Sequence, residues 1–185
     1  MASMSVVTTR FNKSTWEENM QFRKKYNHTC IYPVPKMNSE QIDPYALLFV
    51  VEMNNETNCI EGIGLVRNRC DYQKKYHVYE DNNYNRFCYL GKYHIFRETL
   101  LSYHPRLVFI LDQICFKGKT HLKRGIGMTS ITEKLLRDEI CQGLHIKDEI
   151  KGVFQRHFSK IWQQEEEKEK DDEKEKEKEK DEEKI

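Results

Sequence analysis

The chain has 185 residues and a nearly balanced charge, with 31 Lys and Arg residues against 30 Asp and Glu residues. This balance conceals a basic body. Residues 165–185 carry 13 acidic and 7 basic groups. Residues 1–164 therefore carry the remaining 24 basic and 17 acidic groups, a net charge of +7. The longest apolar run, Ala46–Val51, is far shorter than the roughly 20 residues that span a membrane. The N-terminus lacks the apolar core of a secretory signal. We therefore expect a cytoplasmic or nuclear protein with no membrane partner.

The first part of the chain predicts one helix and one extended segment. We expect residues 1–13 to be flexible. Ser14 and Glu17 form a capping-box pattern, which predicts a helix over Thr15–Tyr26. The two prolines of Cys30–Lys36 then favour an extended edge or connector over a central strand.

Strand patterns dominate the middle of the chain. Tyr45–Met53 and Cys59–Arg67 flank a polar turn and predict a strand hairpin, in which Gly62 and Gly64 mark a bend or a close approach of backbone. Three shorter strand candidates follow, at Tyr76–Tyr79, Arg86–Leu90 and Tyr93–Phe96. Leu107–Phe116 fits either a long strand or a buried helix, and its β-branched and aromatic content favours a strand or a mixed segment.

Helices are expected in the C-terminal third. Thr129 or Ser130 is placed to cap a helix that continues to about Cys141. A second helix is expected over Ile146–Gln163, because apolar residues recur there at helical spacing.

The chain is expected to divide into three parts. Residues 1–13 form the flexible N-terminus, and residues 14–163 form a single globular domain. Residues 164–185 are a Glu- and Lys-rich run of low complexity, which favours a disordered tail. Binding of a protein partner by this tail is an open alternative.

Six cysteines are dispersed along the chain without a Cys-x-x-Cys pair. Several lie inside apolar runs, which favours reduced, buried thiols in an intracellular protein over disulfides. A zinc site needs Cys or His ligands that converge at close spacing, and the sequence shows no such group. We therefore expect no metal and no cofactor.

The most distinctive segment is residues 115–129, CFKGKTHLKRGIGMT. Basic residues alternate there at period two, so an extended backbone would place them on one face, before Arg124 and the glycines close a turn. The alternating residues are Lys117, Lys119, His121 and Lys123. Clustered cations of this kind bind phosphate groups with little sequence preference.

Part of this segment, Gly118-Lys119-Thr120, matches the end of a nucleotide-binding phosphate loop. The complete motif needs a glycine five positions before Gly118, where the chain has Gln113. Nucleotide hydrolysis is therefore disfavoured, and the basic character of the segment is what carries the prediction.

Aromatic and basic residues are interleaved between Tyr72 and Phe96. Aromatic faces stack bases, and arginine contacts phosphates or rings. We take Tyr84, together with Trp16 from the first helix, as candidate stacking residues. The candidate extension of the basic surface consists of Arg67, Arg69, Arg86 and Arg97.

Two catalytic interpretations stay open beside nucleic-acid binding. Tyr89-Leu90-Gly91, followed by Arg97 and His104, is similar to the second half of the GIY-YIG nuclease motif, a resemblance that implies metal-dependent DNA cleavage. Its first half would be His77–Tyr79, which lacks the glycine and the isoleucine of that family, and the metal-binding residue would be Glu133 or Glu139. A thiol–imidazole pair would have to combine His94 or His104 with Cys88 or Cys115.

The order of elements from Cys30 to Phe116 resembles the PUA-like superfamily, which includes the EVE, ASCH and YTH domains. The resemblance rests on the apolar strand Ala46–Val51, a polar turn and the returning strand Ile60–Val66 with its Gly-Ile-Gly. It implies a small, bent, mostly antiparallel β-barrel with flanking N- and C-terminal helices, and recognition of RNA or a modified base. The overall texture of the chain is also similar to that of proteins of large DNA viruses.

Together these patterns predict an α+β domain that binds nucleic acid, RNA rather than DNA, without catalysis. The predicted contacts are the basic segment and the Tyr- and Arg-rich strands. A metal-dependent endonuclease of the GIY-YIG kind and a viral protein-interaction or structural module are the alternatives.

Overall fold

A computed structural model describes residues 4–37, 42–71, 73–141 and 143–159 of the chain. Its centre is a five-stranded mixed sheet with the strand order β6-β4-β3-β1-β7. These strands are β1 (Met4–Phe11), β3 (Leu47–Asn54), β4 (Cys59–Arg67), β6 (Tyr93–Phe96) and β7 (Thr129–Ser130). A separate two-stranded ladder pairs β2 (Cys30–Val34) with β5 (Phe87–Gly91) in antiparallel register. The mixed α and β composition is as predicted, and the described strands do not close a barrel.

The first strand, β1, corrects the expectation of a flexible N-terminus. Met4–Phe11 lies inside the sheet, parallel to β3 on one side and antiparallel to β7 on the other. Every residue from Val6 to Thr9 is buried. A strand that is covered on both faces lacks the alternation of apolar and polar residues that marks a half-exposed strand, which is why its pattern was missed. Its parallel pairing with β3 is the only parallel one among the described strands.

The hairpin of β3 and β4 was predicted correctly. Val50 pairs with Gly64 and Glu52 pairs with Gly62, and the register shifts between Glu52 and Met53. The two glycines permit close approach, because a Cβ at Gly64 would overlap the hydroxyl of Tyr32 and one at Gly62 would lie 2.8 Å from the His94 ring. The strand therefore uses its glycines to admit larger side chains from its neighbours.

The first helix, α1 (Lys13–Tyr26), begins with a different cap from the predicted one. The side chain of Asn12 accepts from the backbone N–H of Thr15, and the Thr15 hydroxyl accepts from the N–H of Asn12, so these two residues form the capping box. Ser14 lies inside the helix and donates to Glu18. The helix consequently starts two residues before the predicted position.

The strand favoured for Leu107–Phe116 is wrong, because α3 (Pro105–Phe116) is a helix. The imidazole Nδ1 of His104 accepts from the N–H of Leu107, and Pro105 occupies the first turn, where its missing N–H costs nothing. Most of the apolar side chains of this helix are buried, whereas Phe109 is 59% exposed. A short apolar run has no periodicity that separates a strand from a buried helix, and the His-Pro start was the available signal.

Two further predictions need adjustment. Tyr76–Tyr79 contains no strand, and Thr129–Ser130 forms β7 instead of a helix cap. Short helical segments follow at α4 (Glu133–Leu136), which Thr132 caps, and at η2 (Glu139–Cys141). Residues 146–159 are helical as predicted, and their apolar members Ile146, Ile150, Val153, Phe154 and Phe158 are buried.

The chain separates into two compact units, Met1–Ile150 and Lys151–Ile185. Within the described residues, the second unit consists of helical residues 151–159. The predicted tail, residues 164–185, lies outside the described residues, and the boundaries expected at 14 and 163 stay predictions. No helix in the described ranges is long and apolar enough to cross a membrane.

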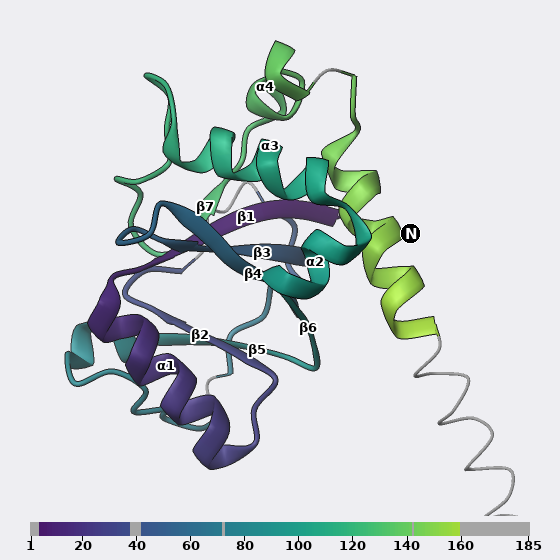
Figure 1. Cartoon of the computed structure of the whole chain (residues 1–185). Helices are drawn as coiled ribbons and strands as arrows, with labels where there is room; N and C mark the ends of the chain where they lie inside the picture. The colour runs from purple at the N-terminus through teal and green to yellow at the C-terminus, as the bar shows by residue number, and fades with distance from the viewer. Residues whose placement is uncertain (1–3, 38–41, 72, 142, 160–185) are drawn as a thin grey trace, which may run out of the picture. The chain divides into compact units, whose positions relative to one another are not determined.

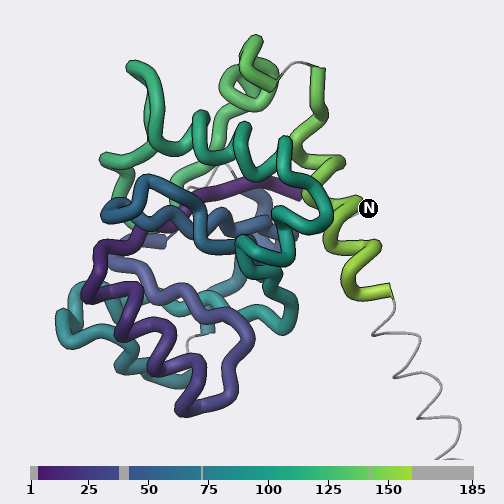
Figure 2. The backbone as a smooth tube through the Cα atoms, viewed as in Figure 1, coloured from purple at the N-terminus to yellow at the C-terminus, as the bar shows by residue number. Residues whose placement is uncertain are grey.

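The first unit is layered. Figure 1 shows α2 (Arg97–Tyr103) and α3 on one face of the five-stranded sheet, and the β2–β5 ladder with α1 on the other. The tube in Figure 2 shows the chain leaving α3 as a projecting loop before it returns to β7 beside β1. A hydrophobic core fills the space between the sheet and the ladder, with Phe11, Tyr32, Leu48 and Tyr89 among its members. This arrangement brings the loop after α3 close to the end of β1.

Candidate nucleic-acid interface

The basic segment forms a loop of turns, residues 117–128, which we call the basic loop. It begins where Lys117 ends α3 and Gly118 turns the chain with a φ of 73°. The backbone turns again at Lys123 and Arg124, so the predicted extended ladder with all basic side chains on one face is wrong. Glycines at both ends of the segment favour such turns over an extended run.

Three contacts hold the basic loop to the body of the protein. The N–H of Leu122 donates to the carbonyl of Cys115 at 2.9 Å. The Nζ of Lys123 donates to Asn58 at 2.6 Å, and the Nη1 of Arg10 donates to the carbonyl oxygen of Lys123. Lys123 is thus a structural residue of the loop as well as a cation.

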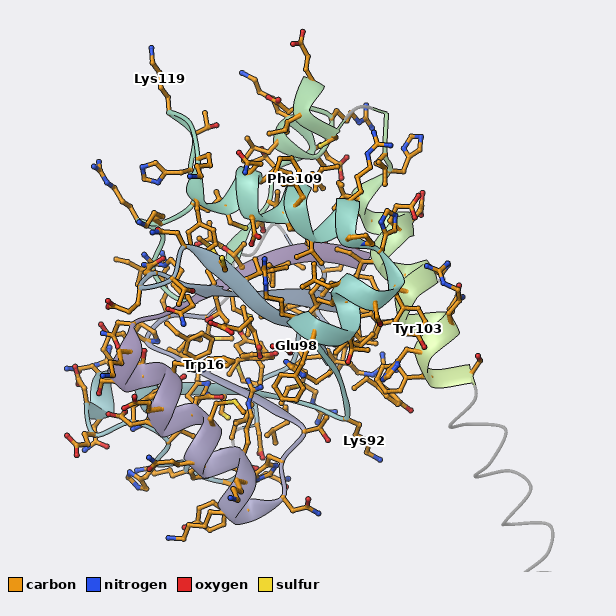
Figure 3. The ribbon with its side chains drawn as sticks, in the orientation of Figure 1. Trp16, Lys92, Glu98, Tyr103, Phe109 and Lys119 are labelled. Atoms are coloured by element: carbon orange, nitrogen blue, oxygen red, sulfur yellow. The ribbon has the colours of Figure 1, made fainter. Side chains whose placement is uncertain are left out.

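The remaining basic side chains of the loop are exposed. Lys117, Lys119 and Arg124 reach solvent, and no ion pair within the described residues involves them. Figure 3 shows Lys119 at the tip of the loop, with its side chain directed away from the sheet. His121 is half-buried, and its Nδ1 accepts from the N–H of Lys123. The loop therefore presents three cations to solvent that have no ion-pair partner in the described ranges.

A pocket of about 170 Å³ lies against the basic loop, and we call it the tyrosine pocket. Gly127 of the loop forms part of its wall and has a φ of 67°, a conformation that favours glycine. The other lining residues are Thr9, Arg10, Phe11, Asn12, Thr15, Pro33, Val34, Pro35, Asn55, Tyr79 and Tyr84. The basic loop and the tyrosine-rich segment, which are far apart in sequence, thus meet at one concave surface.

Two tyrosines supply the aromatic wall of the tyrosine pocket. Tyr79 and Tyr84 meet edge to face, with ring centroids 6.2 Å apart. Tyr79 is buried and its hydroxyl accepts from the amide of Asn19 at 3.0 Å, and burial raises the pKa of that hydroxyl. Tyr84 is 45% exposed. The buried ring is fixed in place, while the exposed ring offers a face to a ligand.

The polar wall contains two side chains with unsatisfied hydrogen-bonding atoms. The Nε of Arg10 and the Oδ1 of Asn55 are buried, and neither has a partner within the described residues. Burial lowers the pKa of Arg10, and the nearby Tyr84 hydroxyl opposes that shift. A buried donor and a buried acceptor without partners cost free energy, about 1–3 kcal/mol each, so their place beside a pocket favours a polar ligand.

The other predicted contact residues have different surroundings. Trp16 is half-buried and meets Phe11 edge to face at 5.1 Å, so its ring packs on the core. Arg97 binds both carboxylate oxygens of Asp112, at 3.1 and 2.8 Å, and also donates to the carbonyl of Ile60. These two side chains serve packing and the attachment of α2 to α3.

Three predicted arginines are exposed but lie away from the tyrosine pocket. Arg86 lines a hollow with Tyr76, His77 and Phe87. Arg67, which is the last residue of β4, and Arg69 line another hollow. The structure therefore separates the predicted basic surface into several patches.

Sequence reasoning missed a buried polar cluster between the sheet and the ladder. Glu52 is fully buried and accepts from Arg23 Nη2 and from the hydroxyl of Tyr32, each at 2.7 Å, while its other oxygen lies 2.9 Å from His94 Nε2. Burial alone would raise the pKa of Glu52, but the charges of Arg23 and His94 outweigh that effect and hold the pKa well below its usual value. A glutamate in the apolar run of β3 was the available signal, since buried carboxylates are paired.

The catalytic interpretations find little geometric support. Tyr89 is buried, and the guanidinium of Arg97 is held by the carboxylate of Asp112. His94 binds Glu52, whereas His104 caps α3 and lies 3.2 Å from Glu149, so neither imidazole pairs with a cysteine.

All six cysteines are free thiols in the structure, and five of them are buried. Burial raises the pKa of Cys88 and of Cys115, which disfavours thiolate chemistry at either residue. In the described part of the chain, no group of three or more His, Cys, Asp or Glu side chains is arranged to hold a metal ion.

The sequence matches no protein-family model, and it matches neither a curated protein nor a solved structure.

Proposed function

We propose that the protein binds nucleic acid without catalysis, with single-stranded RNA as the preferred ligand. The observation that carries the proposal is the meeting of the basic loop with the tyrosine pocket. Single-stranded bases are free to leave a stack and enter such a pocket, whereas the backbone needs cations beside it. The pocket would take the base, and the exposed cations of the basic loop, which borders the pocket through Gly127, would take the backbone.

The contacts divide by chemistry. A base would stack on the exposed ring of Tyr84 and meet the unsatisfied Arg10 Nε and Asn55 Oδ1 in the polar wall. The phosphates flanking that base would meet Lys117, Lys119 and Arg124. Lys123 and His121 would act mainly by shaping the loop, because their side chains already have partners within it or on the body.

Arg67, Arg69 and Arg86 would extend the basic surface at a distance from the pocket. Trp16 and Arg97 are left out of the contact set, because each side chain is engaged inside the protein. Recognition of a modified base is included in the proposal, since the pocket has an aromatic wall and polar groups beside it.

The fold-level part of the proposal is a relationship to the PUA-like superfamily. It is supported by the β3–β4 hairpin with its two glycines and by the antiparallel β2–β5 ladder. The proposed relationship also includes a bent barrel, which would require the ladder and the five-stranded sheet to form one continuous structure. The proposed place of action is the cytoplasm or the nucleus, where free thiols such as these six persist.

Salt-dependent binding tests the proposal directly. The variant Lys117→Ala/Lys119→Ala/Arg124→Ala removes only exposed side chains, so it should fold normally. Fluorescence anisotropy with single-stranded RNA should show weaker binding, and the slope of log affinity against log salt should fall by about 2, since each phosphate contact to a single strand contributes about 0.7.

A variant with the same loss of charge provides the control. Lys13→Ala/Lys24→Ala/Lys134→Ala removes three exposed lysines from α1 and α4. It should leave the salt slope much closer to that of the wild type. Equal effects of the two triple variants would show that only net charge matters and would refute the proposed site.

A further inference from the structure

A second pocket, of about 490 Å³, lies at the far end of the β3–β4 hairpin. We call it the arginine pocket. Its lining residues come from the end of α1, from β3 and β4, and from the turn between β5 and β6. They are His28, Leu47, Leu65, Val66, Arg67, Arg69, Leu90, Gly91, Lys92 and Tyr93.

The charge at the arginine pocket has one sign. Arg67, Arg69 and Lys92 are exposed, and no acidic residue is part of the lining. None of the three forms an ion pair within the described residues, although Arg69 lies over the ring of Tyr45 at 5.5 Å. Figure 3 shows Lys92 at the β5–β6 turn, pointing outward. The lining of this pocket thus carries three exposed cations and no carboxylate.

Arg69 also lines an adjoining hollow that contains Asp71. The carboxylate of Asp71 accepts from the hydroxyl of Tyr76 and from the N–H of Gln73, and the hydrogen bond from Tyr76 lowers the pKa of Asp71. Asp71 therefore has hydrogen-bond partners of its own, and it forms no ion pair with Arg69 among the described residues.

The rest of the lining is apolar and fixed. Leucine and valine side chains, those of Leu47, Leu65, Val66 and Leu90, form most of the remaining wall. The ring of His28 is stacked on Phe22, with centroids 5.9 Å apart, which holds it as a flat part of the wall. A pocket of this volume falls in the range of about 300–1,000 Å³ that suits small organic ligands, with apolar walls and a few convergent polar groups.

The arginine pocket is separate from the tyrosine pocket. Leu47 at one end of β3 lines the former, and Asn55, which follows the other end, lines the latter. Seven residue steps from Leu47 to Asn54, at about 3.3 Å each, place these ends about 23 Å apart. One nucleotide cannot contact both pockets.

We propose that the arginine pocket binds a nucleoside 5′-monophosphate group, with the phosphate on the three cations and the base against the apolar wall. A terminal phosphomonoester carries a charge of about −1.5 to −2 at neutral pH, whereas an internal phosphodiester or a carboxylate carries one. The exposed cations Arg67, Arg69 and Lys92 together match the larger charge, and the forked guanidinium groups match phosphate oxygens. An apolar wall of this extent has no role with inorganic phosphate alone.

Two sources supply this chemical group: a free nucleotide, and the 5′-phosphorylated end of an RNA strand. The RNA source rests on the proposed function, while the nucleotide source is independent of it. The experiment therefore uses both kinds of probe, the free one in calorimetry and the RNA in fluorescence anisotropy.

The first arm titrates AMP, adenosine and inorganic phosphate into the wild type and into Arg67→Ala/Arg69→Ala. AMP should bind the wild type more tightly than either fragment, and the double variant should lose about tenfold or more in AMP affinity. Lys13→Ala/Lys24→Ala removes the same charge from α1 and should bind AMP like the wild type. If AMP binds no better than inorganic phosphate, or if the arginine variant binds it unchanged, the proposal is wrong.

The second arm compares RNA oligonucleotides with and without a 5′-phosphate. A preference for the phosphorylated end that disappears in Arg67→Ala/Arg69→Ala identifies the RNA end as the source. AMP binding without such a preference identifies the free nucleotide as the source. If AMP binds at the arginine pocket but no RNA binds, this proposal stands and the proposed function fails, so the two failures are distinguished.

Discussion

Tyr32 and Glu52 connect the two β-structures of the protein through one hydrogen bond of 2.7 Å, from the phenol of β2 to the carboxylate of β3. The same carboxylate receives Arg23 from α1 and His94 from β6. Glu52 is therefore the common partner of side chains from β2, α1 and β6. Its removal should affect the whole first unit.

The first prediction concerns Glu52→Gln. The change leaves Arg23, which is 4% exposed, without a countercharge in the interior. Breaking a buried pair by removing one partner costs about 3–5 kcal/mol, so the free energy of unfolding measured with urea should fall by about that amount. Glu17→Gln, on the exposed face of α1, is the control and should change little. Equal losses in both variants would contradict a central role for Glu52.

The second prediction concerns acid stability. The pKa of Glu52 in the folded protein lies below its unfolded value of about 4.3, so the stability it contributes is complete above that value and is lost as the pH falls through the folded pKa. Between about pH 5 and pH 3, the wild type should lose stability more steeply than Glu52→Gln, by up to about 1.4 kcal/mol per pH unit. Urea unfolding at a series of pH values measures both slopes, and parallel curves would refute the prediction.

The third prediction concerns the close approach at Gly64. A Cβ there would overlap the hydroxyl of Tyr32, so Gly64→Ala should be strongly destabilising. Tyr32→Phe removes the overlapping oxygen, and the two changes together should cost less than the sum of their separate costs, by about 0.5–3 kcal/mol. Gly125→Ala, which would crowd only Thr129, should add to Tyr32→Phe without such coupling. Simple additivity of Gly64→Ala and Tyr32→Phe would show that the backbone of β4 moves instead.

The fourth prediction concerns the aromatic wall of the tyrosine pocket. Base stacking on an aromatic side chain contributes about 1–3 kcal/mol, so Tyr84→Ala should weaken RNA binding by a corresponding factor. Tyr84→Phe keeps the ring and should retain most of the affinity. Because Tyr84 is 45% exposed, neither change should lower the thermal midpoint by much. If alanine and phenylalanine bind RNA equally, Tyr84 does not stack on a base.

The elements with a single clear pattern were predicted from sequence with good accuracy. The strands Cys59–Arg67 and Tyr93–Phe96 have the predicted bounds, because each is a short run of strand-forming residues between turns. The elements β1 and α3 were not predicted correctly, because each is buried on most sides and tertiary contacts decide its conformation. Local periodicity carries little information where no face is exposed.

The candidate site was predicted in part. The basic loop and Tyr84 were recognised as features of composition, and their meeting at one pocket depends on the pairing of β1 with β7. Arg10 and Asn55 gave no sequence signal, because a single arginine and a single asparagine are common on any surface. Only the fold shows that the Nε of Arg10 and the Oδ1 of Asn55 are buried and that both residues line the same cavity.

The position of β7 has a consequence for the synthesis of the protein. β1 leaves the ribosome first among the described strands, but its second neighbour, Thr129–Ser130, is translated only after α3 and the basic loop. Until then the nascent chain holds a strand with an open edge, which is a risk for aggregation. The basic loop is therefore the last connection made before the sheet is complete, and any change in its length alters when that edge is covered.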